Sequence, residues 1–253
     1  MKILTVDIGN SNICIGCVTD HAVEFVERLN SDRNKTDLEY AVLCKTVLEL
    51  HKIDISALRG AIISSIVPPL TELLHKAIEK LTGIRALIVG PGMKTGINIL
   101  PQGAGADLVV GAVAAIKYYG APSIIIDMGT ATTMTVIDSS RNFIGGVILP
   151  GVALALQSLE AGTAQLPHIQ LKAPGKTIHT ETIESMQAGT VYGSAGAIDA
   201  LIDRMQGELG YETAIIASGG LAPMIVPHCS HSITIDDELL LKGLDILFYK
   251  NSK

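Results

Sequence analysis

The sequence predicts an α/β protein of two related lobes, each with a mixed β-sheet flanked by helices. A hairpin over residues 123–138 supports this class, because two β-branched, apolar runs of strand length enclose a short polar segment. Residues 3–16 repeat the pattern, so Asp7 precedes its counterpart Asp127 by about half of the 253-residue chain. Similarity at half length indicates two lobes that present their hairpins to one site.

Composition limits the classes of function. The chain is 48% hydrophobic and 4% aromatic without Trp, so it can bury a large aliphatic core. Its formal charge is −6, and no basic run occurs, which argues against nucleic acid or an anionic membrane as partner. No stretch of about 18 apolar residues occurs, and Asp7 stands where a signal peptide would need its apolar segment. We therefore expect neither export nor a membrane span, but a cytoplasmic protein.

The four cysteines favour a reduced protein over a metal site. Cys14 and Cys17 have CxxC spacing, but three positions along a strand place them on opposite faces. No second pair completes a metal site, and residues 228–231, with two His and one Cys, read as a loop.

The first half continues from its hairpin into alternating helices and strands. Thr36 and Glu39 have the spacing of a capping box, and Gly83 is a typical helix end. The expected elements are a strand at 22–29, a helix at 36–51, a strand at 61–67, a helix at 68–83 and a strand at 86–89.

A long loop over residues 91–104, rich in Gly and Pro, leads to a helix expected to run to about Tyr119. Asp107 falls in its first turn, where the macrodipole and the free N–H groups favour an anion. A carboxylate held there can accept a proton from a substrate hydroxyl. Alternatively, Asp107 only stabilises the start of the helix.

We expect the first lobe to comprise residues 1–120 and the second lobe residues 121–253. In the second lobe, long helices follow the hairpin. The expected elements are a strand end at 145–151, a helix at 152–160, a loop at 161–181, a helix at 182–209, a strand at 214–218 ending in Gly219 and Gly220, and a helix at 236–251 that closes the second lobe. Other phosphate motifs fail here, because Gln170 stands where a P-loop before Lys176 needs Gly, and no G-x-G-x-x-G follows a strand.

The residues between the strands of each hairpin suit phosphate chemistry. Gly129 permits close backbone approach, the threonine hydroxyls and N–H groups donate hydrogen bonds, and Asp127 offers oxygen to a hard cation. The simpler alternative is that Asp-x-Gly only makes the turn.

Paired hairpins of this kind resemble the actin, Hsp70 and sugar-kinase superfamily, which implies two ribonuclease-H-like, actin-like ATPase lobes with a nucleotide cleft between them. Five segments, in order along the chain, resemble the signature segments of type III pantothenate kinase. They are residues 7–11, 105–107, 127–132, 145–151 and 181–189. The similarity extends from the first strand to the Gly219-Gly220 turn and so covers essentially the whole chain.

The resemblance implies transfer of the γ-phosphate of ATP to the hydroxyl of pantothenate, giving 4'-phosphopantothenate in the first step of coenzyme A biosynthesis. It makes Asp107 the general base and Asp127 a ligand of a monovalent cation, K⁺ or NH₄⁺, with Mg²⁺ on the nucleotide. The implied ATP contacts are Asp7, Ile8, Gly9, Asn10, Ser11, Asn12, Ile13, Cys14 and Thr130. The implied substrate contacts are Gly105, Ala106, Asp107, Leu108 and Thr182. Thr182 would reach pantothenate across a homodimer interface, or serve as a helix N-cap.

Two positions depart from the family pattern. Ser11 stands where Thr is common and keeps the hydroxyl, whereas Leu108 stands where many members have Arg and removes a cation from the expected substrate site. We expect Lys94 to replace that cation. Two other functions stay open, namely a sugar-kinase-like phosphotransferase with another acceptor and a non-enzymatic regulatory accessory protein of the same family.

Overall fold

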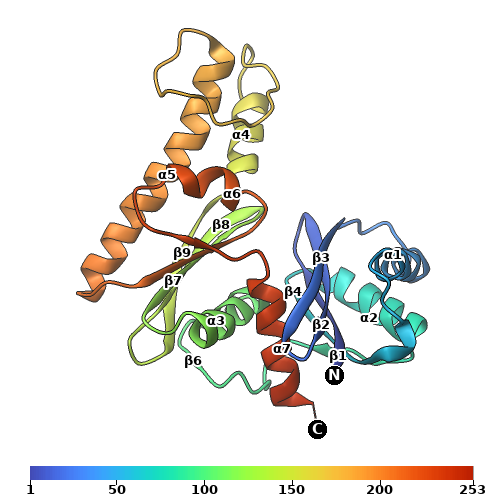
Figure 1. Ribbon diagram of the computed structural model, residues 1–253. Helices are drawn as coiled ribbons and strands as arrows, with labels where there is room; N and C mark the ends of the chain where they lie inside the picture. The colour runs from blue at the N-terminus through green and yellow to red at the C-terminus, as the bar shows by residue number, and fades with distance from the viewer. Residues whose placement is uncertain (253) are drawn as a thin grey trace. The chain divides into compact units, whose positions relative to one another are not determined.

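The computed structural model describes residues 1–252, which form two compact units (Figure 1). Unit 1 comprises Met1–Lys117 together with the segment that starts at Glu238, and unit 2 comprises Tyr118–Asp237. Each unit contains a mixed sheet flanked by helices, which confirms the predicted α/β class. No helix within residues 1–252 is long and apolar enough to cross a bilayer.

Unit 1 is built on a five-stranded sheet in the order β3-β2-β1-β4-β5. The strands are β1 (Lys2–Ile8), β2 (Asn12–Thr19), β3 (Ala22–Asn30), β4 (Leu58–Ser65) and β5 (Leu87–Ile88). β2 runs antiparallel to β1 and β3, and β4 runs parallel to β1. Asp7, near the end of β1, therefore lies opposite Cys14 on one side and Ser64 on the other.

Helices cover both faces of the unit 1 sheet. α1 (Asp37–Leu50) and α2 (Pro68–Thr82) share one core cluster with the sheet, and α3 (Ala106–Tyr118) and α7 (Leu239–Asn251) share another. α1 begins with the predicted capping box between Thr36 and Glu39, and α2 ends at Gly83 in a left-handed conformation, φ 71°. A 3-10 turn (Ile55–Ala57) precedes β4, and the long loop contains the short strand β6 (Asn98–Ile99).

The carboxy-terminal helix α7 packs on unit 1, whereas the sequence places it with the second lobe. Gly60 of β4 leaves room for the ring of Phe248, which would collide with any Cβ there. Gly243 likewise lets α7 approach the backbone of α3 at Val110. Two glycines far apart in the sequence thus create the seat of α7, a packing relation that helical periodicity alone does not reveal.

Unit 2 repeats the strand arrangement of unit 1, with neighbours in the order β11-β10-β7-β8-β9. The strands are β7 (Ser123–Met128), β8 (Ala131–Ile137), β9 (Asn142–Pro150), β10 (Ala214–Ser218) and β11 (Thr234–Ile235). β7 and β8 form the predicted hairpin, and β10 runs parallel to β7. Asp127 therefore lies opposite Thr133 on one side and Ser218 on the other.

The helices of unit 2 differ greatly in length. α4 (Val152–Ala161) and the long α5 (Thr182–Leu209) begin and end close to the predicted residues, and the segment between them is a loop as expected (Figure 1). α6 (Ala222–Ile225) and a 3-10 turn (Val226–His228) follow β10. The sequence did not indicate α6, this 3-10 turn, β6 or β11, because each is too short to show a hydrophobic period.

Candidate active site

The first turn lies between β1 and β2, just after Asp7. The N–H of Gly9 donates to the carbonyl of Asn12 (2.9 Å), which closes the turn. Ser31, which follows β3, holds it from the side through its N–H to the Ser11 carbonyl (3.0 Å) and its hydroxyl to the Gly9 carbonyl (2.7 Å). The turn is therefore fixed by a residue that sequence reasoning did not single out.

Exposure decides how the predicted nucleotide contacts of this turn can act. Residues 10–12 are exposed, Gly9 and Cys14 are half-buried, and Asp7 is buried. Ile8 and Ile13 point into the core that packs against α1 and α2, so only their backbone can meet a ligand. Cys17 belongs to that core, whereas Cys14 packs on the opposite one, which confirms that the two thiols point to opposite faces.

The second turn lies between β7 and β8, just after Asp127. The N–H of Gly129 donates to the carbonyl of Ala131 (3.1 Å), and Thr130 is exposed. Gly219 has φ 99°, and a Cβ on it would lie 2.6 Å from the Met128 carbonyl, so only glycine lets β10 end so close to this turn.

The surroundings of Asp127 suit a hard monovalent cation. Its register neighbours are two hydroxyl residues, Thr133 and Ser218, and the buried Thr133 Oγ1 has no hydrogen-bond partner among the described residues. A carboxylate beside hydroxyl oxygens is the donor set that such a cation prefers. Within residues 1–252, no group of three His, Cys, Asp or Glu side chains is placed to hold a metal.

Asp107 lies in the first turn of α3, and its carboxylate folds back over the helix start. Its Oδ1 accepts a hydrogen bond from the Leu108 N–H (2.9 Å), and Val109 N–H donates to the Gly105 carbonyl (3.2 Å). A Cβ on Gly105 would collide with this carboxylate and would touch Ile66, which follows β4. Glycine at 105 thus leaves room for the Asp107 carboxylate in this position.

Burial raises the pKa of the Asp107 carboxyl, although hydrogen bonds from the N–H groups of Leu108 and Asp107 itself lower it. The sequence led us to expect that the helix start would favour the anion. The structure shows that removal from water outweighs that effect. Asp107 consequently holds a proton more readily than an exposed aspartate, which is a useful property in a general base.

The loop before α3 is fastened to the last turn of α7. The Lys94 N–H donates to Asn251 Oδ1 (2.9 Å), and Asn251 Nδ2 donates to the Lys94 carbonyl (3.0 Å). Lys250 Nζ donates to the Thr95 carbonyl (2.7 Å). The backbone of Lys94 is therefore held, its side chain is exposed, and Leu108 is half-buried on α3.

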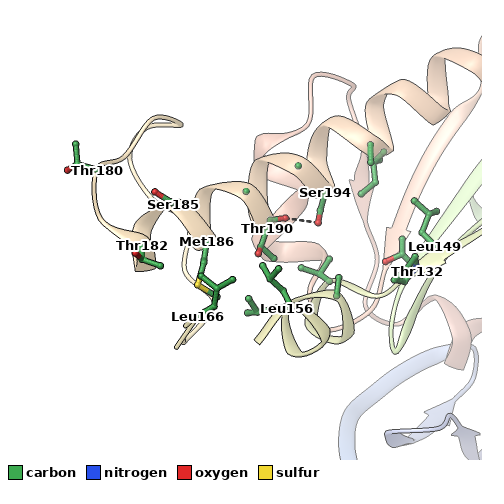
Figure 2. A pocket seen from close by; sticks show the side chains of 18 residues that line it. Thr132, Leu149, Leu156, Leu166, Thr180, Thr182, Ser185, Met186, Thr190 and Ser194 are labelled. Carbon is green, nitrogen blue, oxygen red and sulfur yellow. Dashed lines mark hydrogen bonds between the residues drawn. The ribbon is translucent and has the colours of Figure 1, made fainter. Parts of the chain in front are cut away.

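Unit 2 contains a cavity of about 740 Å³ along α4 and α5, and Thr182 and Thr132 lie toward its opposite ends (Figure 2). No charged side chain lines it. The hydroxyl residues that line it are Thr132, Thr180, Thr182, Ser185, Thr190 and Ser194. Its apolar lining includes Leu156, Leu166 and Met186. Such a mixture suits a small, extended ligand with hydroxyl and amide groups.

Thr182 is the first residue of α5 and is exposed at the cavity. The N-cap of α5 is Glu181, and no side-chain hydrogen bond caps this helix. The alternative role of Thr182 as an N-cap is therefore wrong, and its hydroxyl is not used for capping.

Large apolar side chains are exposed on the elements that border the cavity. Ile148 of β9 is 75% exposed, and Ile178 of the loop between α4 and α5 is 85% exposed. Leu154 and Leu159 of α4 and Ile183 of α5 are also exposed. Exposed apolar residues gathered on the elements of one site often mark a protein interface.

Comparison with known proteins shows the family and the fold. The chain matches the family model of type III pantothenate kinase over residues 3–204. It is 39% identical over 252 residues to the type III pantothenate kinase of Brevibacillus brevis, covering 98% of this chain and 99% of that protein. It is 38% identical over 253 residues to the enzyme of that name from Moorella thermoacetica, covering 99% and 100% of the two chains.

Two solved structures share the fold at low sequence identity. The activator of 2-hydroxyisocaproyl-CoA dehydratase from Clostridium difficile, solved with bound ADPNP, superposes with a TM-score of 0.60 at 12% identity and covers 99% of this chain and 94% of its own. Component A of (R)-2-hydroxyglutaryl-CoA dehydratase from Acidaminococcus fermentans gives a TM-score of 0.58 at 12% identity, with 96% and 95% covered.

Proposed function

This chain belongs to the type III pantothenate kinase family, and we propose how its residues share the work of phosphorylating pantothenate. It is a phosphotransferase of coenzyme A biosynthesis that uses ATP with Mg²⁺. The observation that carries the division of roles is Asp107, a half-buried carboxyl at a helix start within the matched Gly105–Asp107 segment. Phosphoryl transfer requires mostly positioning and charge neutralisation, so a single well-placed base is sufficient side-chain chemistry.

Asp107 accepts the proton of the pantothenate hydroxyl as that oxygen attacks the γ-phosphate. The raised pKa of its carboxyl and its fixed position over Gly105 support this role. Ala106 and Gly105 contribute backbone contacts to the substrate, and Leu108 an apolar contact. Because Leu108 supplies no charge, Lys94, whose side chain is exposed, pairs with the pantothenate carboxylate.

The two turns hold the phosphates of ATP. In the first turn, Asp7, Gly9 and the exposed residues 10–12 supply the contacts, with Ile8, Ile13 and Cys14 acting through their backbone. In the second, the exposed Thr130 donates its hydroxyl. Mg²⁺, when bound with ATP, neutralises phosphate charge, and Asp7 is the acid best placed on the first turn to attract it.

Asp127 holds K⁺ or NH₄⁺. The proposal is supported by the hydroxyl residues Thr133 and Ser218 in register with Asp127. An ionised carboxylate near the phosphates would otherwise repel them.

Thr182 and the cavity of unit 2 bind pantothenate in a homodimer. The exposed apolar residues on α4, α5 and the loop between them support a second copy as partner, because a protein interface would remove them from water. A cytoplasmic location is supported by the cysteines, none of which forms a disulfide within the described residues.

ADP release coupled to a reporter enzyme tests the proposed activity. ADP release that requires pantothenate, with phosphorylated pantothenate found by mass spectrometry, is the expected result. ADP release with glucose but not with pantothenate would instead indicate a sugar-kinase-like enzyme. Binding of ADPNP without turnover of either acceptor would favour the regulatory accessory protein.

A further inference from the structure

Ser64 is a buried serine near the end of β4, in the part of the unit 1 sheet that also holds Asp7. Its side chain is 0% exposed, and its hydroxyl has no hydrogen-bond partner among the described residues. β4 runs parallel to β1 with Ser64 opposite Asp7. Because residues in register on neighbouring strands point to the same face, the Ser64 hydroxyl and the Asp7 carboxylate are side by side.

The residue that follows β4 is close to the segment of the proposed base. Ile66 lies just beyond the end of β4, two positions after Ser64, and a Cβ on Gly105 would touch its side chain. Gly105 in turn supports the Asp107 carboxylate. Ser64 therefore lies opposite Asp7 and two positions before a residue close to Gly105.

A nearby residue shows how a buried hydroxyl on this face is ordinarily satisfied. Thr5 lies two residues before Asp7 on β1 and is also 0% exposed. Its hydroxyl donates to the Gly16 carbonyl (3.1 Å). A buried hydroxyl without a partner costs free energy, and alanine would avoid that cost. Ser64 is thus suited to a hydrogen bond that forms in another state of the protein.

Unit 2 has a related arrangement beside its own acid. Thr133 lies opposite Asp127, and its buried hydroxyl also has no hydrogen-bond partner within residues 1–252. Each Asp-x-Gly acid therefore has, on one of its neighbouring strands, a buried hydroxyl without a hydrogen-bond partner among the described residues.

We propose that Ser64 is a positioning residue of the phosphoryl-transfer site, and that its hydroxyl donates a hydrogen bond to the Asp7 carboxylate when a nucleotide is bound. The bond orients the carboxylate toward the phosphates and keeps it ionised. This inference rests on the proposed role of Asp7 in nucleotide binding, but it does not depend on the identity of the acceptor.

The test compares Ser64→Ala with Ser123→Ala. Ser123 of β7 is a matched control, because it is also 0% exposed, its hydroxyl also has no partner, and its register neighbours are Ile137 and Ala214 rather than an acid. Both variants should keep or slightly raise the melting temperature. Only Ser64→Ala should weaken ADPNP binding, measured calorimetrically with Mg²⁺, by about 10- to 100-fold, the range for a hydrogen bond to a charged group.

A double-mutant cycle with Asp7→Ala makes the test specific. In the Asp7→Ala background, Ser64→Ala should change the ADPNP Kd less than twofold, because the bond has already been lost. Equal ADPNP affinity in Ser64→Ala and wild type, or an effect that persists undiminished without Asp7, would overturn the proposal. Because the readout is nucleotide affinity, failure of pantothenate turnover in wild type would refute the proposed function separately.

Discussion

The two units share a strand plan and differ in what is added to it. The orders β3-β2-β1-β4-β5 and β9-β8-β7-β10-β11 correspond strand for strand, and each central strand carries an acid, Asp7 or Asp127, with a serine in register on the parallel neighbour. Between the third and fourth strands along the chain, unit 1 inserts one main helix, α1, whereas unit 2 inserts α4, a loop and the 28-residue α5.

The additions carry the features that the repeat lacks. In unit 1, α3 carries Asp107 and packs on the sheet face to which Asp7 belongs. In unit 2, α4 and α5 leave room for a cavity between them. The repeated part therefore suits what is common to all ATP chemistry, namely phosphates. The unrepeated parts suit the acceptor and the proton transfer.

The largest expected effect concerns the acid at the start of α3. Asp107→Asn should lower kcat by roughly 10²- to 10⁴-fold, because the variant cannot accept the hydroxyl proton, while the ADPNP Kd should hardly change. Steady-state ADP release and calorimetry measure the two quantities. Asp237→Asn is the control, since this exposed acid stands just before α7 and is not expected to contact substrate. Near-normal turnover in Asp107→Asn would show that Asp107 is not the general base.

The second prediction asks whether the two Asp-x-Gly acids have different tasks. ADP release should be at least about tenfold slower in Na⁺ than in K⁺ or NH₄⁺, because an uncompensated carboxylate near phosphate is strongly repulsive. Asp127→Ala should abolish the difference between the salts, whereas Asp7→Ala should lose activity in all of them. If Asp7→Ala instead removes the salt response, the cation belongs to unit 1.

The third prediction concerns recognition of the pantothenate carboxylate by unit 1. Lys94→Ala should raise the KM for pantothenate about tenfold, with little change in the KM for ATP, as expected for loss of one charge-assisted hydrogen bond. Lys45→Ala, on the exposed side of α1, is the matched control. Asn251→Ala, which releases the Lys94 backbone, should raise the same KM by a smaller factor.

An unchanged pantothenate KM in Lys94→Ala would exclude this lysine from the site. In that case Leu108→Arg is informative. A large fall in the KM of that variant would show that no residue had taken over the role of the family arginine.

The smallest expected effect is on stability. Thr36→Ala should lower the free energy of unfolding by about 1 kcal/mol, because α1 loses its capping box. Thr182→Ala should cost less than half as much, because α5 has no side-chain cap, yet it should raise the KM for pantothenate. Urea unfolding and steady-state kinetics separate the two outcomes. Equal losses of stability would show that Thr182 supports α5 after all.

The sequence by itself determined the features that depend on neighbours along the chain. The capping box at Thr36, the helix end at Gly83 and the bounds of α5 follow from local hydrogen bonding, backbone freedom and periodicity. The two hairpins and the five matched segments were sufficient for the fold class and the family, both of which are confirmed.

Only the tertiary structure decided the features that join distant segments. The seat of α7 on unit 1 depends on Gly60 and Gly243, and the hold on Lys94 depends on Asn251, 157 positions later in the chain. The raised pKa of Asp107 is likewise a consequence of burial by packing, which a helix-start argument alone predicts with the opposite sign. Ser64 belongs to no local sequence pattern, and its role is proposed only because β1 places Asp7 opposite it. Register and burial are properties of the assembled sheet and cannot be found from neighbours along the chain.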